Sequence, residues 1–309
     1  MRKTHLIFII TIIICSVIVT LISVRKLCNV SDDEAISIAK HFLKRVDVNS
    51  DGEPSIKRDI SQILVFGLRS KLVLFGKDSN ALLLNIDCNN GNVVNFKNRG
   101  LLYRASNRSS SNGGRNSLAE PQILDKEKAR LIILSYGNLI GLPGDVLFSS
   151  IRLDKTNSVW IGQWKRSFNG IEFEGDYVAI SIMASGGELY GYSNSIHGTT
   201  SKTEPSITQK QAIDVSYNEF ASFFSETKWN QNKNKFEVKS VELKLVNSSS
   251  FLSQILFSRY DTKLAWVVVI DTKKGMDSKT VGILNKDPSI FRVDAITNKL
   301  ISSEINVVP

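Results

Sequence analysis

Four residues near the start of the chain match S-x-x-K, the pattern that places a serine nucleophile beside a lysine in penicillin-recognising enzymes. Ser37 and Lys40 supply the two reactive side chains. The match lies in a segment whose apolar spacing predicts an amphipathic helix, and no K-T-G companion occurs, so we interpret it as coincidental. The chain also lacks the H-E-x-x-H, G-x-S-x-G and Walker patterns. We therefore expect no catalytic residues, no cofactor and no enzyme activity.

A metal site is not expected either. The three histidines, His5, His41 and His197, lie far apart along the chain. A zinc site needs about four ligands at suitable spacings, which this set does not offer.

The cysteines leave two interpretations open. Cys28 and Cys88 could form a disulfide on an oxidising side of a membrane. Alternatively, Cys88 is a small buried residue, because Ala184 and Ala295 hold the corresponding place in two later hairpins. We favour the second interpretation, which accounts for Cys88 without a bridge.

Five side chains in the middle of the chain are the candidates for partner binding: Trp160, Trp164, Arg166, Tyr190 and Tyr192. The aromatic residues fall on predicted strands and most simply form a core cluster. They could instead line a concave groove that receives a peptide, with Asp176 and Glu188 nearby, because an exposed sheet edge can add a partner strand.

Residues 6–24 form a run of nineteen residues without a charge. A helix of this length spans about 28 Å, close to the roughly 30 Å of a bilayer core. A cleaved signal peptide is the alternative, but Ser23-Val24-Arg25 offers no small-residue cleavage site. We predict a retained single-pass anchor within residues 1–28. The basic residues at its two ends nearly balance, and the acidic run at 32–34 favours an extracytoplasmic position for the rest of the chain.

The formal net charge of +9 is concentrated in two places. Four basic residues flank the apolar run, and five more lie between positions 97 and 115 without an acidic residue among them. Much of this second stretch is rich in Ser, Asn and Gly, which is typical of a linker. The folded parts are therefore predicted to be electrically balanced, and we expect no specific nucleic-acid partner.

Three segments begin with helix N-cap signals, at Ser31, Asp125 and Thr208. Each is followed by two short strands and a tight turn whose key position favours positive φ: Gly91, Gly187 and Asn298. The predicted fold class is α+β, with repeated units of one helix packed on an antiparallel meander sheet, preceded by one transmembrane helix.

The segment 164–192 carries a Trp, a basic residue, Asn-Gly-Ile, a strand with Gly-Asp and then a strand, turn and strand. This layout resembles PepSY domains, especially tandem forms of the YcdB/YcdC kind, and is similar to the propeptides of thermolysin-like metalloproteases. Residues 264–269 and 293–301 resemble the closing hairpin of the same family, with Asn298 in place of its usual Gly, and residues 86–94 match weakly. The resemblance implies a PepSY or cystatin-like fold and a noncatalytic extracytoplasmic module, often connected with inhibition or folding of proteases.

The expected organisation is an anchor at 1–28, a divergent PepSY-like unit at 29–98, a basic linker at 99–120, and two PepSY-like units at 121–198 and 204–309. The expected function is a membrane-tethered binding module that modulates an envelope protease or other envelope protein. The alternative is a structural scaffold subunit of an envelope or secretion complex. Neither the partner nor the oligomeric state follows from the sequence.

Overall fold

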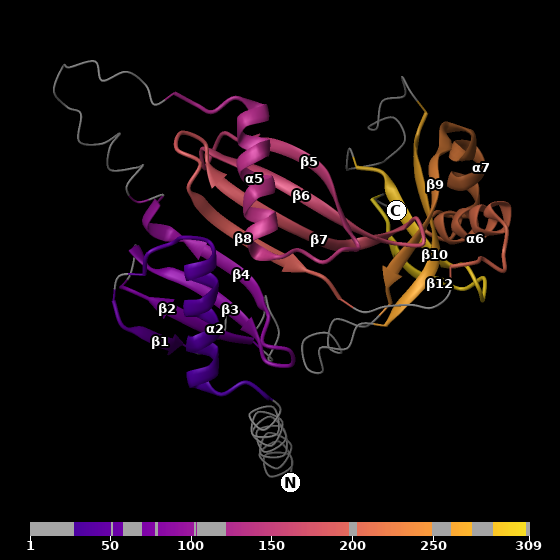
Figure 1. Ribbon diagram of the computed structural model, residues 1–309. Helices are drawn as coiled ribbons and strands as arrows, with labels where there is room; N and C mark the ends of the chain where they lie inside the picture. Colours follow the sequence, from indigo (N-terminus) through magenta and orange to yellow (C-terminus); the bar gives the residue numbers. More distant parts are fainter. Residues whose placement is uncertain are drawn as a thin grey trace, which may run out of the picture. The chain divides into compact units, whose positions relative to one another are not determined.

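The computed structural model describes residues 28–50, 52–57, 70–77, 80–101, 103, 122–197, 203–248, 261–273 and 287–306. The elements in chain order are α2 (Asp32–Arg45), β1 (Pro54–Lys57), β2 (Ser70–Phe75), β3 (Leu82–Asp87), β4 (Val93–Asn98), α5 (Lys126–Ile140), β5 (Val146–Asp154), β6 (Val159–Phe168), β7 (Ile171–Met183), β8 (Leu189–Ser195), α6 (Gln209–Ser222), α7 (Glu226–Asn232), the 3-10 helix η2 (Lys233–Lys235), β9 (Phe236–Asn247), β10 (Thr262–Thr272), β11 (Ser289–Asp294) and β12 (Leu300–Glu304) (Figure 1).

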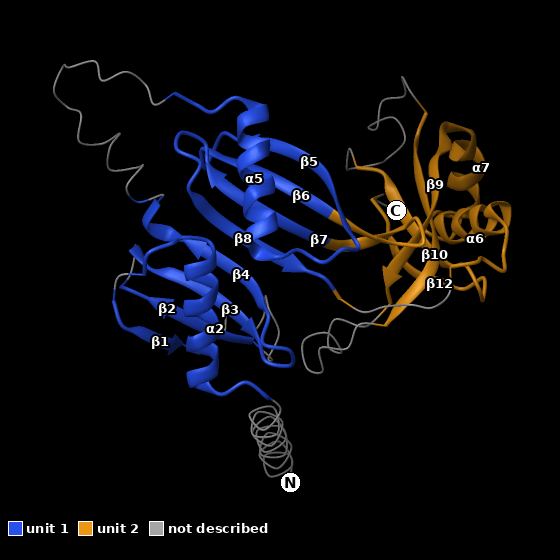
Figure 2. Cartoon of the chain, in the orientation of Figure 1, with its two compact units in different colours: residues 1–164, 177–196, 251–258 blue, residues 165–176, 197–250, 259–309 orange. Residues whose placement is uncertain are grey.

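The chain divides into two compact units (Figure 2). Unit 1 comprises Met1–Trp164, Tyr177–Ile196 and Phe251–Ser258. Unit 2 comprises Lys165–Asp176, His197–Ser250 and Arg259–Pro309, and so includes the turn that joins β6 to β7.

All three predicted helix starts are confirmed. Ser31 and Glu34 form a reciprocal capping box at the start of α2, and Thr208 and Gln211 form another at the start of α6. The Asp125 side chain accepts a hydrogen bond from the Lys128 amide at the start of α5. Such caps satisfy amides that have no partner within the helix, which is why these positions begin helices in sequence and in structure.

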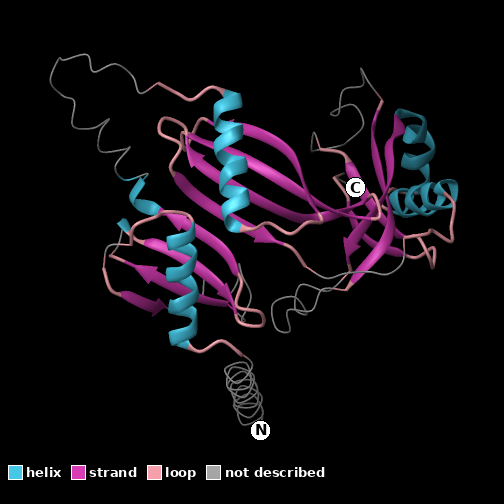
Figure 3. Ribbon diagram, in the orientation of Figure 1, coloured by secondary structure: helices cyan, strands magenta, loops and turns pink. Residues whose placement is uncertain are grey.

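In unit 1, α2 and α5 pack on the strands (Figure 3). These strands lie in the order β1-β2-β3-β4-β8-β7-β6-β5. The two helices contact each other and share one hydrophobic core. Ala35, Ala39 and Phe42 bury the inner face of α2, while Ala129 and Ile133 bury that of α5. A Cβ at Gly162 would collide with Ile133, so this glycine permits the close approach of α5 to β6.

Unit 2 packs α6 against β9, β10 and β11 of an antiparallel sheet completed by β12. Phe220 of α6 lies at the centre of its core and is only 1% exposed. Its ring makes edge contacts with Phe224, Trp229, Phe236 and Phe291, at centroid separations of 4.9–5.9 Å. Edge-to-face aromatic contacts add to the free energy gained by burial, so Phe220 joins α6 both to the sheet and to α7.

Each of the main helices is preceded by a pre-helix segment, the residues immediately before its N-cap, that bonds to a hairpin turn. The backbone amides of Asn29, Leu124 and Ile207 donate to the carbonyls of Cys88, Ala184 and Ala295, respectively, at 2.8–3.1 Å. The residue at the turn is almost fully buried in all three cases. A small side chain is needed there because the pre-helix segment passes directly over it.

Side chains reinforce two of these pre-helix segments in the same way. The indole N–H of Trp160 donates to the Leu124 carbonyl, and that of Trp266 donates to the Ile207 carbonyl, both at 3.1 Å. The strand register places Lys71 at the corresponding position of β2, where it pairs with Asp32 in the first turn of α2.

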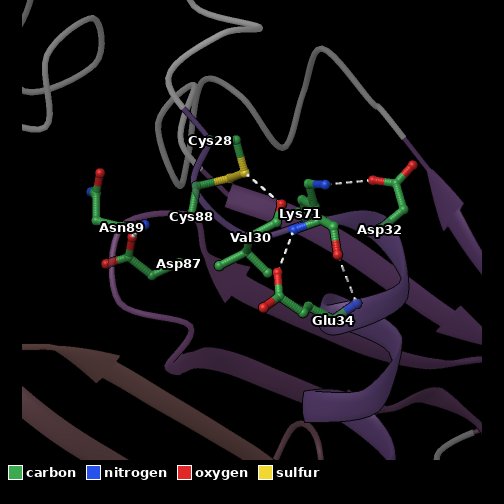
Figure 4. The surroundings of a disulfide bond; sticks show 9 residues. Cys28, Val30, Asp32, Glu34, Lys71, Asp87, Cys88 and Asn89 are labelled. Atoms are coloured by element: carbon green, nitrogen blue, oxygen red, sulfur yellow. Dashed lines mark hydrogen bonds and ion pairs between the residues drawn. A yellow bond between two sulfur atoms is a disulfide. The ribbon is translucent and has the colours of Figure 1, made fainter.

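The first pre-helix segment is instead held by a disulfide between Cys28 and Cys88, with a Cα–Cα distance of 4.7 Å (Figure 4). Our preferred interpretation of Cys88 as a bridge-free buried residue was therefore wrong. The equivalence with Ala184 and Ala295 is correct, but it gave no information about Cys28, which the fold brings beside Cys88 across 60 positions of sequence.

The predicted fold class was also wrong. The twelve strands are not separate meanders with one helix each. Ten of them follow one hydrogen-bonded order from β1 to β12, and β6, which pairs with β7, and β5, which pairs with β6, lie off this path. In that order β4 pairs antiparallel with β8, and Phe173 of β7 pairs in parallel with Leu245 of β9. The sheet is mixed, and more of the described residues lie in strands than in helices. Periodicity and turn signals report pairing between neighbours in sequence, whereas the β4–β8 and β7–β9 pairings join distant segments.

The predicted membrane segment, residues 6–24, lies outside the described residues. Among the described residues, no helix has the length and apolar character needed to cross a membrane. Most of the predicted linker at 99–120 is likewise outside the described residues, and the predicted domain boundaries stay predictions.

Replacing Phe220 by Ala should lower the free energy of unfolding of unit 2 by about 3–5 kcal/mol, because it leaves a cavity among four aromatic rings. Phe223, three positions later and 41% exposed, is the matched control, and Phe223→Ala should cost less than about 1 kcal/mol. Urea unfolding followed by tryptophan fluorescence measures both values. Equal losses would contradict the assignment of Phe220 as the centre of this core.

Replacing Cys28 and Cys88 together by Ala should lower the free energy of unfolding by about 2–4 kcal/mol, because the bridge restricts the unfolded chain. Reducing agent should destabilise the parent by a similar amount and leave the double variant unchanged. Chemical denaturation with and without dithiothreitol makes the comparison. A parent protein that is insensitive to reduction would show that the bridge does not stabilise the fold.

Candidate functional site

The five residues predicted to bind a partner are all buried, each at most 9% exposed. Trp160 and Trp164 both belong to the core beneath α5. The Trp164 ring meets Phe148 edge-on at 5.1 Å and packs against Gly137 of α5. These contacts give both tryptophans a structural role, which agrees with the simpler interpretation of the cluster as core.

Tyr190 and Tyr192 do not line one groove. Tyr192 lies in the core that carries the helices, with its ring 5.8 Å from that of Phe42. Tyr190 belongs to a separate cluster with Val159 and Met183. Two residues that are two apart on a regular strand share a face, but the β7–β8 register shifts between Ser181 and Ile182, opposite Tyr190. This bulge separates the two tyrosines, and periodicity alone gave no sign of it.

Arg166, in unit 2, has several partners already. Its guanidinium pairs with Asp176 at 3.1 Å and donates to the His197 carbonyl at 2.6 Å. It also stacks over the Phe173 ring at 4.5 Å. The Asp176 carboxylate accepts a further hydrogen bond from the His197 amide. Breaking such a buried pair leaves an uncompensated charge, so Arg166 holds the β6–β7 hairpin together.

A cavity of about 370 Å³ lies in unit 1. It lies where α2 approaches the end of α5, above β8 and the turn before β4. Its lining combines polar and apolar side chains, namely Ser37, Ile38, His41, Phe42, Arg45, Asn92, Val93, Ile140, Pro143, Tyr192 and Asn194, together with Gly91 and Gly141. Only Tyr192 among the predicted partner-binding residues reaches this cavity.

The polar side chains of α2 face the cavity at helical spacing. Ser37, His41 and Arg45 are four residues apart, so they lie on one side of the helix, and all three are exposed. Arg45 Nη1 donates to the Ile140 carbonyl at the end of α5, at 3.1 Å. In the sequence, Ser37 is notable only as part of the S-x-x-K match and His41 only as one of three histidines. The signal present in the sequence was the four-residue spacing that places these side chains on one helix face. It could not reveal the cavity, because α5, the helix that completes it, is distant in sequence.

Tyr192 forms the buried end of the cavity. Burial raises its pKa to about 12, and a hydrogen bond with Asn194 offsets part of this shift. The phenol therefore keeps its proton at neutral pH and can donate a hydrogen bond. The cavity has no Asp or Glu among the described residues that line it. This arrangement can bind a polar or anionic group.

The part of the chain that the structure describes contains no group of three or more His, Cys, Asp or Glu side chains placed to hold a metal ion. Of the histidines considered above, His41 lies in unit 1 and His197 in unit 2, while His5 lies outside the described residues.

Comparisons with known proteins leave the family open. No family model matches the chain, and no curated protein matches it in sequence. The solved C-terminal domain of Bacillus megaterium YpeB is similar in structure over 91% of this chain and 99% of its own, with a TM-score of 0.43 and 11% sequence identity. A likeness at this level assigns neither family nor function. The PepSY-type resemblance, including its narrower YcdB/YcdC form, therefore rests on the sequence.

The raised pKa of Tyr192 predicts a specific loss of stability in alkali. The folded state holds this proton more tightly than the unfolded state, so the stabilisation is complete below about pH 10 and is lost as pH rises toward 12. Tyr192→Phe should therefore show a shallower fall in the free energy of unfolding above pH 10, by up to about 1.4 kcal/mol per pH unit. Urea unfolding at a series of pH values measures the difference. Parallel curves for parent and variant would contradict the shift.

Proposed function

We propose that the chain is a noncatalytic binding module that works outside the cytoplasm, where it binds an extended segment of an envelope protein along the edge of β5. The main support for this proposal is that β5, nine residues long, pairs with β6 alone among the described strands. An edge strand presents a row of N–H and C=O groups that another chain can pair with. Backbone hydrogen bonds would supply the affinity, and pockets for alternate side chains the specificity.

The other two outer strands are less suited to this role. β1 has only four residues and begins with Pro54, which has no amide hydrogen to donate. β12 has five residues, and its register with β11 shifts between Arg292 and Val293. Short length, proline and irregularity are the usual means of blocking a sheet edge. β5 is longer, contains no proline, and leaves Leu147 66% exposed.

The disulfide supports an extracytoplasmic location. Bridges between distant cysteines form and persist in oxidising compartments and are rare in the cytoplasm. Cys28 lies a few residues after the apolar run at 6–24, which we interpret from sequence as a single-pass membrane anchor. On this proposal the two units are held at the outer side of the cell membrane.

The PepSY-type resemblance of the sequence favours an envelope protease as the partner that the module modulates. A scaffold subunit of an envelope or secretion complex is the second candidate, since two copies of an open edge can also pair with each other. The identity of the chain bound at β5 separates the two functions.

Replacing Leu147 by the photo-crosslinking residue p-benzoylphenylalanine should give a crosslink to another envelope protein in intact membranes, identified by mass spectrometry. Leu131 of α5 is 62% exposed and provides the matched control, at which the same residue should give no such crosslink. Crosslinks to a second copy of the chain alone would support the scaffold function. No crosslink at Leu147, or the same product at both positions, would contradict binding at β5.

Adjacent prolines test the backbone bonding directly. Along a regularly paired edge strand, successive residues direct their amides alternately toward the partner strand and away from it. Of Ser149→Pro and Ser150→Pro, one should therefore abolish the crosslink with little change in melting temperature, and the other should lower the melting temperature by breaking the pairing with β6. Crosslinking that survives both substitutions would exclude strand addition as the binding mode.

A further inference from the structure

The cavity between α2 and α5 is a second candidate binding site, and it does not depend on β5. Its mouth is formed by Ser37, His41 and Arg45, three hydrogen-bonding side chains of one helix face. The Arg45 guanidinium is a permanent cation, and the described lining contains no acid to neutralise it. The site therefore favours a ligand with a negatively charged end.

Arg45 is positioned to bind that end. Its bond to the Ile140 carbonyl uses one of the five N–H groups of the guanidinium and fixes the side chain between the ends of the two helices. The planar arrangement of the remaining donors fits a carboxylate, which can accept two parallel hydrogen bonds. Lys44, in the same turn, does not line the cavity.

The interior of the cavity is suited to an apolar group. Phe42 and Ile140 are buried core residues, and Ile38 and Val93 are half-buried. Tyr192 and Asn194 provide polar groups at its base. A volume of about 370 Å³ falls within the range of small-molecule sites, so a ligand of a few non-polar carbons and one carboxylate fits.

We propose that this cavity binds a carboxylate joined to an apolar group, with the carboxylate on Arg45 and His41 and the apolar group against Phe42 and Ile140. The same chemistry is carried by the C-terminal residue of a peptide and by a free aliphatic carboxylic acid. Neither ligand requires the partner proposed at β5.

The test uses the full-length chain in a nonionic detergent and three probes: N-acetyl-Ala-Leu, its C-terminal amide, and 4-methylpentanoate. Saturation-transfer NMR titrations to about 10 mM detect dissociation constants in the millimolar range expected for a few contacts. N-acetyl-Ala-Leu should bind and the amide should not. Binding of 4-methylpentanoate with similar affinity would identify the carboxylate and apolar group as sufficient, and binding of the peptide acid alone would identify a peptide C-terminus.

Variants locate the binding. Arg45→Gln should weaken binding at least about tenfold, the loss expected when a charged hydrogen-bonding pair is removed, whereas Lys44→Gln should change it less than about twofold. Ser37→Phe should block the exposed mouth while leaving Arg45 and His41 in place, which keeps the test valid if Arg45→Gln fails to fold. Equal binding of acid and amide, absence of binding by both acids, or equal affinity in Ser37→Phe and the parent would each overturn the proposal.

Discussion

The hydrogen bond between each pre-helix segment and the buried carbonyl at a hairpin turn is the constraint on which the rest of the structure depends. A buried carbonyl without a partner costs free energy, so the segment that passes over it must lie close and in a fixed register. This requirement explains why the turn position holds Cys88, Ala184 or Ala295, since a larger side chain would lift the segment away. It also fixes where each helix begins on its strands.

Two different means hold the same contact in place. Trp160 and Trp266 each donate an indole N–H to the carbonyl just before a helix N-cap, whereas the first segment is held by the Cys28–Cys88 bridge and the Lys71–Asp32 pair. The bridge strengthens the attachment of the segment before α2, and such a bond persists in an oxidising environment. Because α2 carries Arg45 and the exposed mouth of the cavity, the same bond that fits an extracytoplasmic location also supports the candidate carboxylate site.

The two proposed binding features use different chemistry. β5 offers backbone groups along an open edge, which suits a long extended segment and tolerates variation in sequence. The cavity offers the Arg45 guanidinium at its mouth and an apolar interior, which suits a small ligand or the end of a chain. Trp164 and Arg166, the residues most prominent in sequence, instead serve the packing of α5 and of the β6–β7 hairpin.

The local features follow from residue types and their spacing along the chain. The caps at Ser31, Asp125 and Thr208 begin helices, and Gly91, Gly187 and Asn298 adopt the positive φ that their turns require. These features depend on residues a few positions apart, so their types and spacing suffice to predict them. Four other features arise only when the whole chain folds: the β4–β8 pairing, the bulge that separates Tyr190 from Tyr192, the Cys28–Cys88 bridge and the cavity lined by Arg45. Each of these depends on which distant segments pair and in what register, and the free energy that selects the pairing comes from burying many side chains together rather than from any local pattern.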